Sequence, residues 1–272
     1  FSGYTFSWAA NAQARTWSVI RRKRRPFSLA GSYLTPTTSA AANVERHARR
    51  LAGKGAHAVV VLGGGTVPTL VAIGNGPHRV VECVDDDLVE IEWRTTAAIR
   101  ATFDDPQVAG RAVAQWRVAQ SVYDPDGIGA AVQHLAQSWD WDRAGFDCDR
   151  WVANEIVSAA ARVVTLVERR EQGDRRGAAL ARVGLANALL WVMAQHHRLL
   201  HVDDSELWML VTSVMGADWE RDLDIALGVE RGSADLAALS LYRYALGRAD
   251  RTLSATQRIA AESALDAAER AT

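Results

Sequence analysis

The sequence predicts an α+β fold in which a small mixed β-sheet domain, residues 1–127, precedes an all-α helical bundle domain, residues 128–272. Two observations predict this order. Before residue 128, short runs rich in β-branched apolar residues end at Gly or Pro, which is typical of strands. After it, apolar residues recur at a spacing near 3.6 over long segments, which is typical of helices. A chain of 272 residues is long enough for two domains.

Six strands are expected in the first half, and two of them form a hairpin across the acidic turn 85–87. In the second strand of this hairpin, apolar residues at 89, 91 and 93 alternate with Glu90 and Glu92, so the two glutamates share one face. The expected strands span 27–32, 59–62, 70–73, 79–84, 88–93 and 122–123. The expected helices of this half span 7–23, 40–51 and 107–120.

The second half is expected to contain helices alone. A long helix spans 148–171, and a second helix restarts at Asp174 after Gly173. Asp204 or Ser205 is the expected N-cap of the next helix, and Ser254 that of the last one. The four later helices are expected at 205–215, 217–227, 233–246 and 254–270.

Composition and charge exclude several classes of protein. The 49% hydrophobic and 23% charged residues fit a globular chain, and two cysteines exclude a disulfide framework or a Cys-rich zinc module. No apolar run approaches the roughly 18 to 20 residues that span a bilayer. We therefore expect a cytoplasmic protein with no membrane partner.

The net charge of −1 conceals a basic N-terminal end. Residues 1–54 hold ten Lys or Arg against one acid, so they carry +9 and the remainder carries −10. This asymmetry indicates an anionic partner near the N-terminus, and a solvated Arg-rich helix end explains it equally well.

Two groups of residues in the first half are candidates for phosphate and metal binding. Gly31 and Ser32 end an expected strand, where glycine lets the backbone approach a ligand and a hydroxyl can bind a phosphate oxygen. Glu90 and Glu92, together with the acidic turn 85–87, offer the carboxylate oxygens that Mg²⁺ prefers. The alternative for these acids is a solvated strand face beside a polar turn. The Gly-rich segment 63–65 lacks the Lys of a P-loop and is interpreted as the loop that follows the strand at 59–62.

Two features of the second half have weaker functional interpretations. His197 and His201 are four residues apart and are expected to share a helix face, as metal-binding pairs do, but a structural role is favoured. Trp139, Trp141 and Trp151 cluster near the domain boundary, where they can line a cleft or pack in the core. Core packing is the preferred interpretation for most of the ten tryptophans.

The turn Tyr123-Asp124-Pro125-Asp126-Gly127 and its surroundings resemble the nucleotidyltransferases that modify aminoglycoside and lincosamide antibiotics. In that family, a DNA-polymerase-β-like core precedes a helical domain, and a Tyr-Asp-x-x-Gly turn marks the boundary. The segments 150–155 and 171–178 also resemble the opening of the family's helical domain. The resemblance covers about residues 27–210, and the match is close only at the boundary.

The resemblance implies transfer of a nucleoside monophosphate from a nucleoside triphosphate to a hydroxyl of a small molecule, an aminoglycoside or lincosamide antibiotic among the candidates. It implies that Gly31 and Ser32 hold the phosphates, that Glu90 or Glu92 binds Mg²⁺, and that Glu155 acts as general base. The sequence departs from the family at one place. The family's Asp-x-Asp metal pair, expected on a strand near residues 39–44, is missing, and Ala40–Ala42 supply no carboxylate.

Three hypotheses therefore stand. The first is the Mg²⁺-dependent transferase. The second is a degenerate protein of the same fold that binds a nucleotide or small molecule without turnover, which the missing carboxylates favour. The third is a nucleotidyltransferase acting on RNA, with Arg21–Arg25 contacting phosphates.

Overall fold

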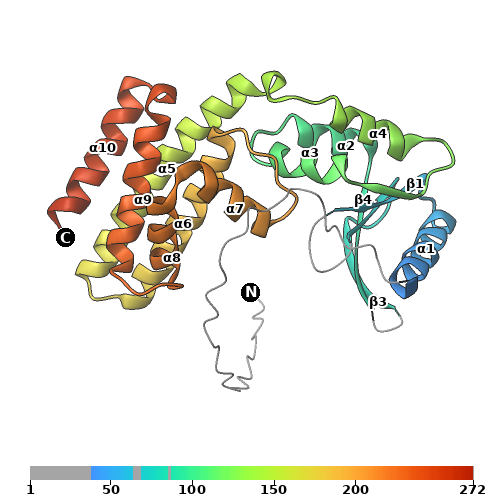
Figure 1. Ribbon diagram of the computed structural model, residues 1–272, viewed down its shortest axis with the longest axis horizontal. Helices are drawn as coiled ribbons and strands as arrows, with labels where there is room; N and C mark the ends of the chain where they lie inside the picture. Colours follow the sequence, from blue (N-terminus) through green and yellow to red (C-terminus); the bar gives the residue numbers. More distant parts are fainter. Residues whose placement is uncertain (1–37, 64–68, 85–86, 272) are drawn as a thin grey trace, which may run out of the picture. The chain divides into compact units, whose positions relative to one another are not determined.

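The order of strands and helices follows the predicted change from a mixed half to a helical half (Figure 1). A computed structural model describes residues 38–63, 69–84 and 87–271, and all of them belong to one unit of the chain, Pro36–Thr272. Among these described residues, no strand follows Tyr123, as predicted. The division into domains at residue 127 stays a prediction.

The bounds of the elements agree closely with the sequence prediction in most places. The first half contains α1 (Thr38–Gly53), β1 (Ala58–Leu62), β2 (Thr69–Ile73), β3 (Arg79–Val84), β4 (Asp87–Arg94), α2 (Thr96–Phe103), α3 (Ala109–Arg117) and β5 (Gln120–Tyr123). The second half contains α4 (Ile128–Gln137), the 3₁₀ turn η1 (Trp141–Arg143), α5 (Gly145–Glu171), α6 (Arg175–His196), α7 (Asp204–Met215), α8 (Ala217–Leu227), α9 (Ala234–Ala249), the 3₁₀ turn η2 (Asp250–Thr252) and α10 (Ala255–Arg270).

The five described strands form one mixed sheet with the order β3-β4-β2-β1-β5. β2 and β4 are parallel, with Thr69 opposite Glu90, and all other neighbours are antiparallel. The predicted hairpin is present, since β3 and β4 pair with Arg79 opposite Glu92. The parallel pair places β4 beside a strand that lies far from it in sequence, and this neighbour was not predicted.

Helices cover the two faces of the sheet differently (Figure 1). On one face, Leu51 of α1 packs in a core with Leu70 and Ile91. On the other face, Ile99 and Trp116 pack over Val60 and the rest of the inner strands in a second core, to which α2, α3 and α4 contribute. The alternation predicted for β4 is confirmed, because residues 89, 91 and 93 are at most 7% exposed and belong to the α1 face.

The helical half is built around α5 and α6, which pack on each other and on α9, while α10 packs on α5. Its core includes the fully buried Trp219 and Tyr242, and the Tyr242 hydroxyl donates to the Ile156 carbonyl at 3.3 Å. Ser254 caps α10 in a capping box with Gln257, which confirms its predicted role. Burial raises the pKa of Tyr242, so its hydroxyl remains a hydrogen-bond donor.

One described helix, α6, is long and apolar enough by length and composition to cross a membrane. Leu185, Leu189 and Met193 of this helix are fully buried in the helical core. These contacts identify α6 as the central helix of a bundle. The cytoplasmic location expected from the sequence stays a prediction.

Two local predictions were wrong, each because a tertiary contact or a cap changes the end of an element, and two short helices, α2 and α4, were not predicted. The helix predicted at 107–120 is the shorter α3, since Gln120 already pairs with Val61 in the sheet. The N-cap of α7 is Asp203, whose side chain accepts from Glu206 N at 2.8 Å. Helix α2 is short and begins at the N-cap Thr95.

The helix face predicted for His197 and His201 does not exist. α6 ends at His196, His197 is its C-cap, and Arg198 follows with a φ of 56°. His201 therefore lies in the connection to α7, where its backbone N–H donates to the Gly110 carbonyl of α3 at 3.4 Å. Gln115 of α3 also donates to the Val202 carbonyl at 2.9 Å, so this connection joins α3 to the helical half.

His201 is a buried histidine without a hydrogen-bond partner for either ring nitrogen among the described residues. Its ring meets that of Trp191 edge-on, with centroids 5.2 Å apart. Burial, and secondarily the charge of Arg111, lowers the pKa of His201 to about 4, against the opposing effect of Asp204 and Asp203.

This lowered pKa predicts a loss of stability in mild acid. Between about pH 6.5 and pH 4 the unfolded chain binds a proton at His201 that the folded chain does not, so the free energy of unfolding falls as pH falls, by up to about 3 kcal/mol. Urea titrations at several pH values measure it. In His201→Leu, most of the decrease in the free energy of unfolding with falling pH should disappear. A smaller decrease should remain from His196 and His197, because burial also lowers their pKa values.

The exposed His134 is the control for this experiment. His134→Gln should leave the pH dependence of unfolding as it is in the wild type. An unchanged slope in His201→Leu contradicts the burial of a neutral His201.

Candidate functional site

The candidate site lies on the outer part of the sheet, on the face opposite to α1. Because Val89, Ile91 and Trp93 occupy the α1 face, the alternating Glu90 and Glu92 must point to the other face. Both glutamates remain half-buried there, with side chains 17% and 14% exposed. A carboxylate so far removed from water is costly unless it is paired.

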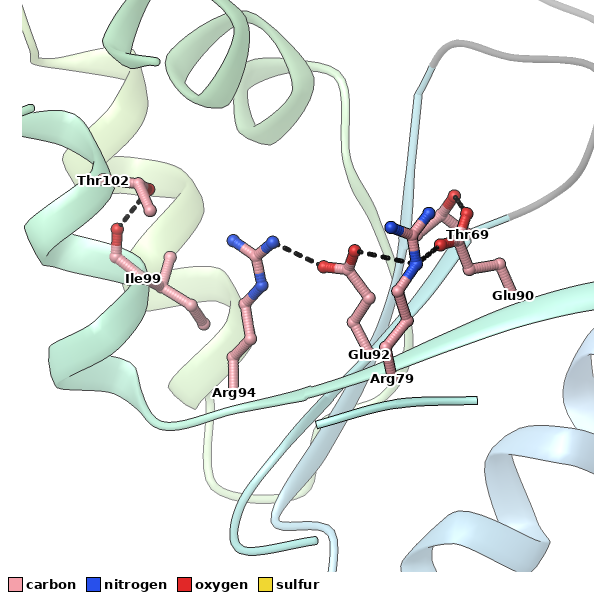
Figure 2. A network of polar contacts seen from close by, with 7 residues as sticks. All are labelled: Thr69, Arg79, Glu90, Glu92, Arg94, Ile99 and Thr102. Atoms are coloured by element: carbon pink, nitrogen blue, oxygen red, sulfur yellow. Dashed lines mark hydrogen bonds and ion pairs between the residues drawn. The ribbon is translucent and has the colours of Figure 1, made fainter. Parts of the chain in front are cut away.

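Arginines of β3 and β4 form ion pairs with the two glutamates (Figure 2). Arg79 of β3 forms an ion pair through Nε with Oε1 of Glu90, and the same nitrogen lies 4.0 Å from Oε1 of Glu92. Arg94 Nη2 lies 2.6 Å from Oε2 of Glu92. Thr69 Oγ1 of β2 donates to Oε2 of Glu90 at 3.5 Å. These five residues form one chain of contacts, the Glu90–Glu92 network.

The charges of this network balance. Two carboxylates face two guanidinium groups, and the hydrogen bond with Glu90, followed by its charge, raises the pKa of Arg79. Arg79 is 63% exposed, so the outer end of its guanidinium remains in contact with solvent. Its ion pairs use Nε, which leaves the other guanidinium donors for a ligand.

The neighbours of the two glutamates on this face supply no further acid. Thr69 and Val71 of β2 lie opposite Glu90 and Glu92, and on β3 the opposite residues are Val81 and Arg79. Across the described part of the chain, no three His, Cys, Asp or Glu residues are grouped as metal ligands.

This donor set does not fit a two-metal centre, because Mg²⁺ needs several free oxygen ligands and both glutamates already form ion pairs with arginine. We therefore derive no step through a metal ion. Mg²⁺ binding by Glu90 or Glu92 stays a prediction.

The remaining candidate residues are dispersed. Glu155 lies half-buried on α5, one turn after Trp151, which packs against the helical core. Gly31, Ser32 and the basic cluster 21–25 lie outside the described residues, as do Asp85 and Asp86. The roles that the resemblance implies for Gly31, Glu92 and Glu155 require one shared site, and that site stays a prediction.

The helix predicted at 40–51 is confirmed as α1, so residues 39–44, where the resembling family carries its metal-binding strand, are helical in this chain. The strand that runs parallel to β4 is β2, a neighbour that was not predicted. Sequence reasoning also missed Arg79, Arg94 and Thr69. The hairpin register was a signal for Arg79, since a short turn at 85–87 places it opposite Glu92. No local signal exists for Thr69, which reaches Glu90 through the parallel pairing.

The turn that carries the family resemblance has a structural role. Asp124 Oδ1 accepts from Gly129 N at 3.1 Å, and its Oδ2 accepts from Ala130 N at 2.9 Å. Gly127 has a φ of 68°, a left-handed conformation that favours glycine. The Asp and Gly of this motif therefore begin helix α4, and they need no ligand to explain them.

The neighbouring Trp139 and Trp141 contact each other edge to face, with ring centroids 4.8 Å apart. Trp139 is 2% exposed and belongs to the core beneath α2 and α3. Core packing, the preferred interpretation of the sequence, thus holds for Trp139.

Comparisons with known proteins give likeness to solved structures alone. No family model matches the sequence, and no curated protein matches it. A search of solved structures finds a nucleotidyltransferase-like protein from Exiguobacterium sibiricum 255-15, at 6% sequence identity and a TM-score of 0.48. The overlap covers 77% of this chain and 74% of that chain. The function is therefore argued from the residues of this chain.

The Asp124 contacts predict a measurable loss of stability. Asp124→Ala removes the acceptor of two N–H groups in the first turn of α4, so the free energy of unfolding should fall by about 1 to 2 kcal/mol in urea titrations. Asp126→Ala, an exposed acid of the same turn, is the matched control and should change it by less than about 0.5 kcal/mol. Equal effects of the two variants would show that Asp124 does not cap α4.

Proposed function

We propose that this chain is a nucleotidyltransferase-like protein that binds a nucleotide, or another small phosphate compound, without transferring a nucleotidyl group. One observation carries the proposal: both candidate metal ligands, Glu90 and Glu92, are engaged by arginines. Nucleotidyl transfer depends on cations that neutralise developing charge on the phosphates. Carboxylates already paired with arginine are poor ligands for such cations.

The same network supports binding of an anion. Arg79 is 63% exposed and keeps guanidinium donors beyond those paired with Glu90, and a guanidinium fork matches the geometry of phosphate oxygens. The glutamates hold the side chain in place, which reduces the entropy lost when a ligand binds. The nucleotide as ligand rests on the sequence resemblance, and the phosphate contact rests on Arg79.

The transferase remains the second candidate, favoured by one specific observation. Glu90 and Glu92 extend from one strand to the same face, as two ligands of one metal must. A divalent cation would have to displace Arg79 to use both. The RNA-directed hypothesis depends on residues 21–25, which lie outside the described residues.

The proposal predicts nucleotide binding that does not require a divalent cation. Calorimetric titration with each of the four common ribonucleoside triphosphates should give saturable binding of at least one of them in EDTA. Arg79→Ala should weaken that binding about tenfold, which corresponds to one charge-assisted contact. Arg49→Ala, which removes an exposed arginine of α1, is the matched control and should leave binding unchanged.

A parallel assay distinguishes the transferase. With Mg²⁺, triphosphates and a panel of aminoglycosides and lincosamides, the proposed binding protein releases no pyrophosphate. Mg²⁺-dependent release that Glu92→Gln abolishes would establish the transferase instead. A wild-type chain that binds none of the four nucleotides contradicts the transferase and also the nucleotide as the ligand of the proposed binding protein.

A further inference from the structure

The connection between α6 and α7, residues 197–203, joins the two cores on either side of it. Leu199 packs against the core of the helical half, and Leu200 packs against the core to which α2, α3 and α4 contribute. Helix α3 approaches the connection so closely that a Cβ atom on Gly110 would lie 2.7 Å from the Leu199 carbonyl oxygen. These residues lie outside the Glu90–Glu92 network, so their role is independent of the proposed function.

The α6–α7 connection is attached to α3 by hydrogen bonds of unequal quality. Gln115 Nε2 donates to the Val202 carbonyl at 2.9 Å. The bond from His201 N to the Gly110 carbonyl is long, at 3.4 Å. Arg198, near the start of the connection, has a φ of 56°, a left-handed conformation that costs energy for a residue with a side chain. A segment with these features can open locally while the rest of the chain stays folded.

Buried polar atoms without a hydrogen-bond partner gather at this connection. Within the described residues they include both ring nitrogens of His201, Nδ1 of His196, Nε2 of His197 and Oε1 of Gln195. Each of these atoms has lost contact with water and gained no partner, which disfavours the closed arrangement. A proton bound to one of the three rings adds a buried charge and increases this cost.

The surroundings of His201 oppose its protonation. The side chain is fully buried, and the Trp191 ring meets it edge-on. Burial has the largest effect in lowering the pKa of His201, and the charge of Arg111 on α3 lowers it further. Asp203 and Asp204, at the start of α7, act in the opposite direction but do not restore the ordinary pKa.

The two histidines at the end of α6 are affected in the same direction. Burial lowers the pKa of His196 and of His197. Arg198 and Arg248 add to the effect at His196, and Asp149 of α5 opposes it. At His197, the neighbouring His196, whose ring centroid lies 5.0 Å away, and Arg248 of α9 add to the effect of burial.

We propose that the α6–α7 connection is a pH switch: in mild acid, protonation of His201, aided by His196 and His197, releases the connection from α3 while both cores stay folded. An imidazolium in the released connection is hydrated, whereas in the closed connection it is buried beside Arg111. Proton binding therefore favours the released state. The two cores consist of apolar side chains, which bind no proton in mild acid.

Native-state hydrogen exchange of the full chain tests the switch. The protection of the amides at 198–202, corrected for the effect of pH on intrinsic exchange, is compared at about pH 7.5 and about pH 4.5. Protection should fall at least about tenfold at the lower pH. The reason is that a His201 ring with a pKa of about 4 in the closed state regains a pKa of about 6.5 on release and binds a proton.

Low concentrations of urea distinguish local release from global unfolding. In the acidic sample, exchange at 198–202 should change less than about twofold up to about 1 M urea, because local release exposes little surface. Exchange in β2 and α9, which contribute to the two cores, should rise about tenfold, because it requires global unfolding.

Variants identify the group that binds the proton. His201→Leu should lose most of the acid-induced fall in protection, whereas His134→Gln, an exposed control, should show the wild-type fall. The proposal is overturned if protection at 198–202 does not fall in acid, if urea raises exchange there in step with β2 and α9, or if His201→Leu keeps the full wild-type fall. The first two comparisons use the wild type, so they decide the question even if His201→Leu does not fold.

Discussion

The pairing of Glu90 and Glu92 with arginines is the interaction on which the interpretation of this protein depends. Both carboxylates are less than one-fifth exposed, and unpaired they would carry a large desolvation cost. Arg79 and Arg94 offset that cost from within the same sheet. The positive charges that compensate these two carboxylates therefore come from arginines of the chain itself. Removing an arginine should leave a half-buried charge unpaired, and the same pairing opposes a metal at this place.

The direction of the two glutamates follows from the rest of the sheet. One face of β4 is apolar and consists of residues 89, 91 and 93. Helix α1 and the inner strands bury this face. A shift of one residue in register would turn Glu90 and Glu92 into that core, so the hydrophobic face determines where the acids lie. The parallel pairing of β2 with β4 then brings Thr69 to Glu90, and the hairpin brings Arg79.

Much of the fold could be predicted from the sequence because its signals are local. The β3–β4 hairpin, the alternation along β4 and the capping box at Ser254 each depend on neighbours within a few residues. The errors arose where contacts between residues far apart in sequence determine the ends and neighbours of an element. α3 ends early because Gln120 joins the sheet, and the parallel neighbour of β4 depends on the whole topology.

The candidate site was predictable in part for the same reason. Period-2 alternation placed Glu90 and Glu92 on one face, and it places Arg94 there too once the strand is extended by one residue beyond Trp93. It could not reveal that Thr69 of another strand reaches Glu90. The role of Glu155 was implied by the family resemblance alone, and no local signal in the sequence distinguishes this residue as a general base. The Tyr123–Gly127 turn that carried this resemblance proves to be a helix start, which any protein with such a junction can use.

The central claim is that arginine occupies the place of a metal at Glu90 and Glu92, and a titration with Mn²⁺ followed by electron paramagnetic resonance tests it most directly. The wild type should show no site with a dissociation constant below about 1 mM. Arg79→Ala combined with Thr69→Asp removes the guanidinium and adds a third carboxylate opposite Glu90, and this variant should gain a Mn²⁺ site. A wild-type site that binds Mn²⁺ tightly, and that Glu92→Gln removes, would contradict the claim.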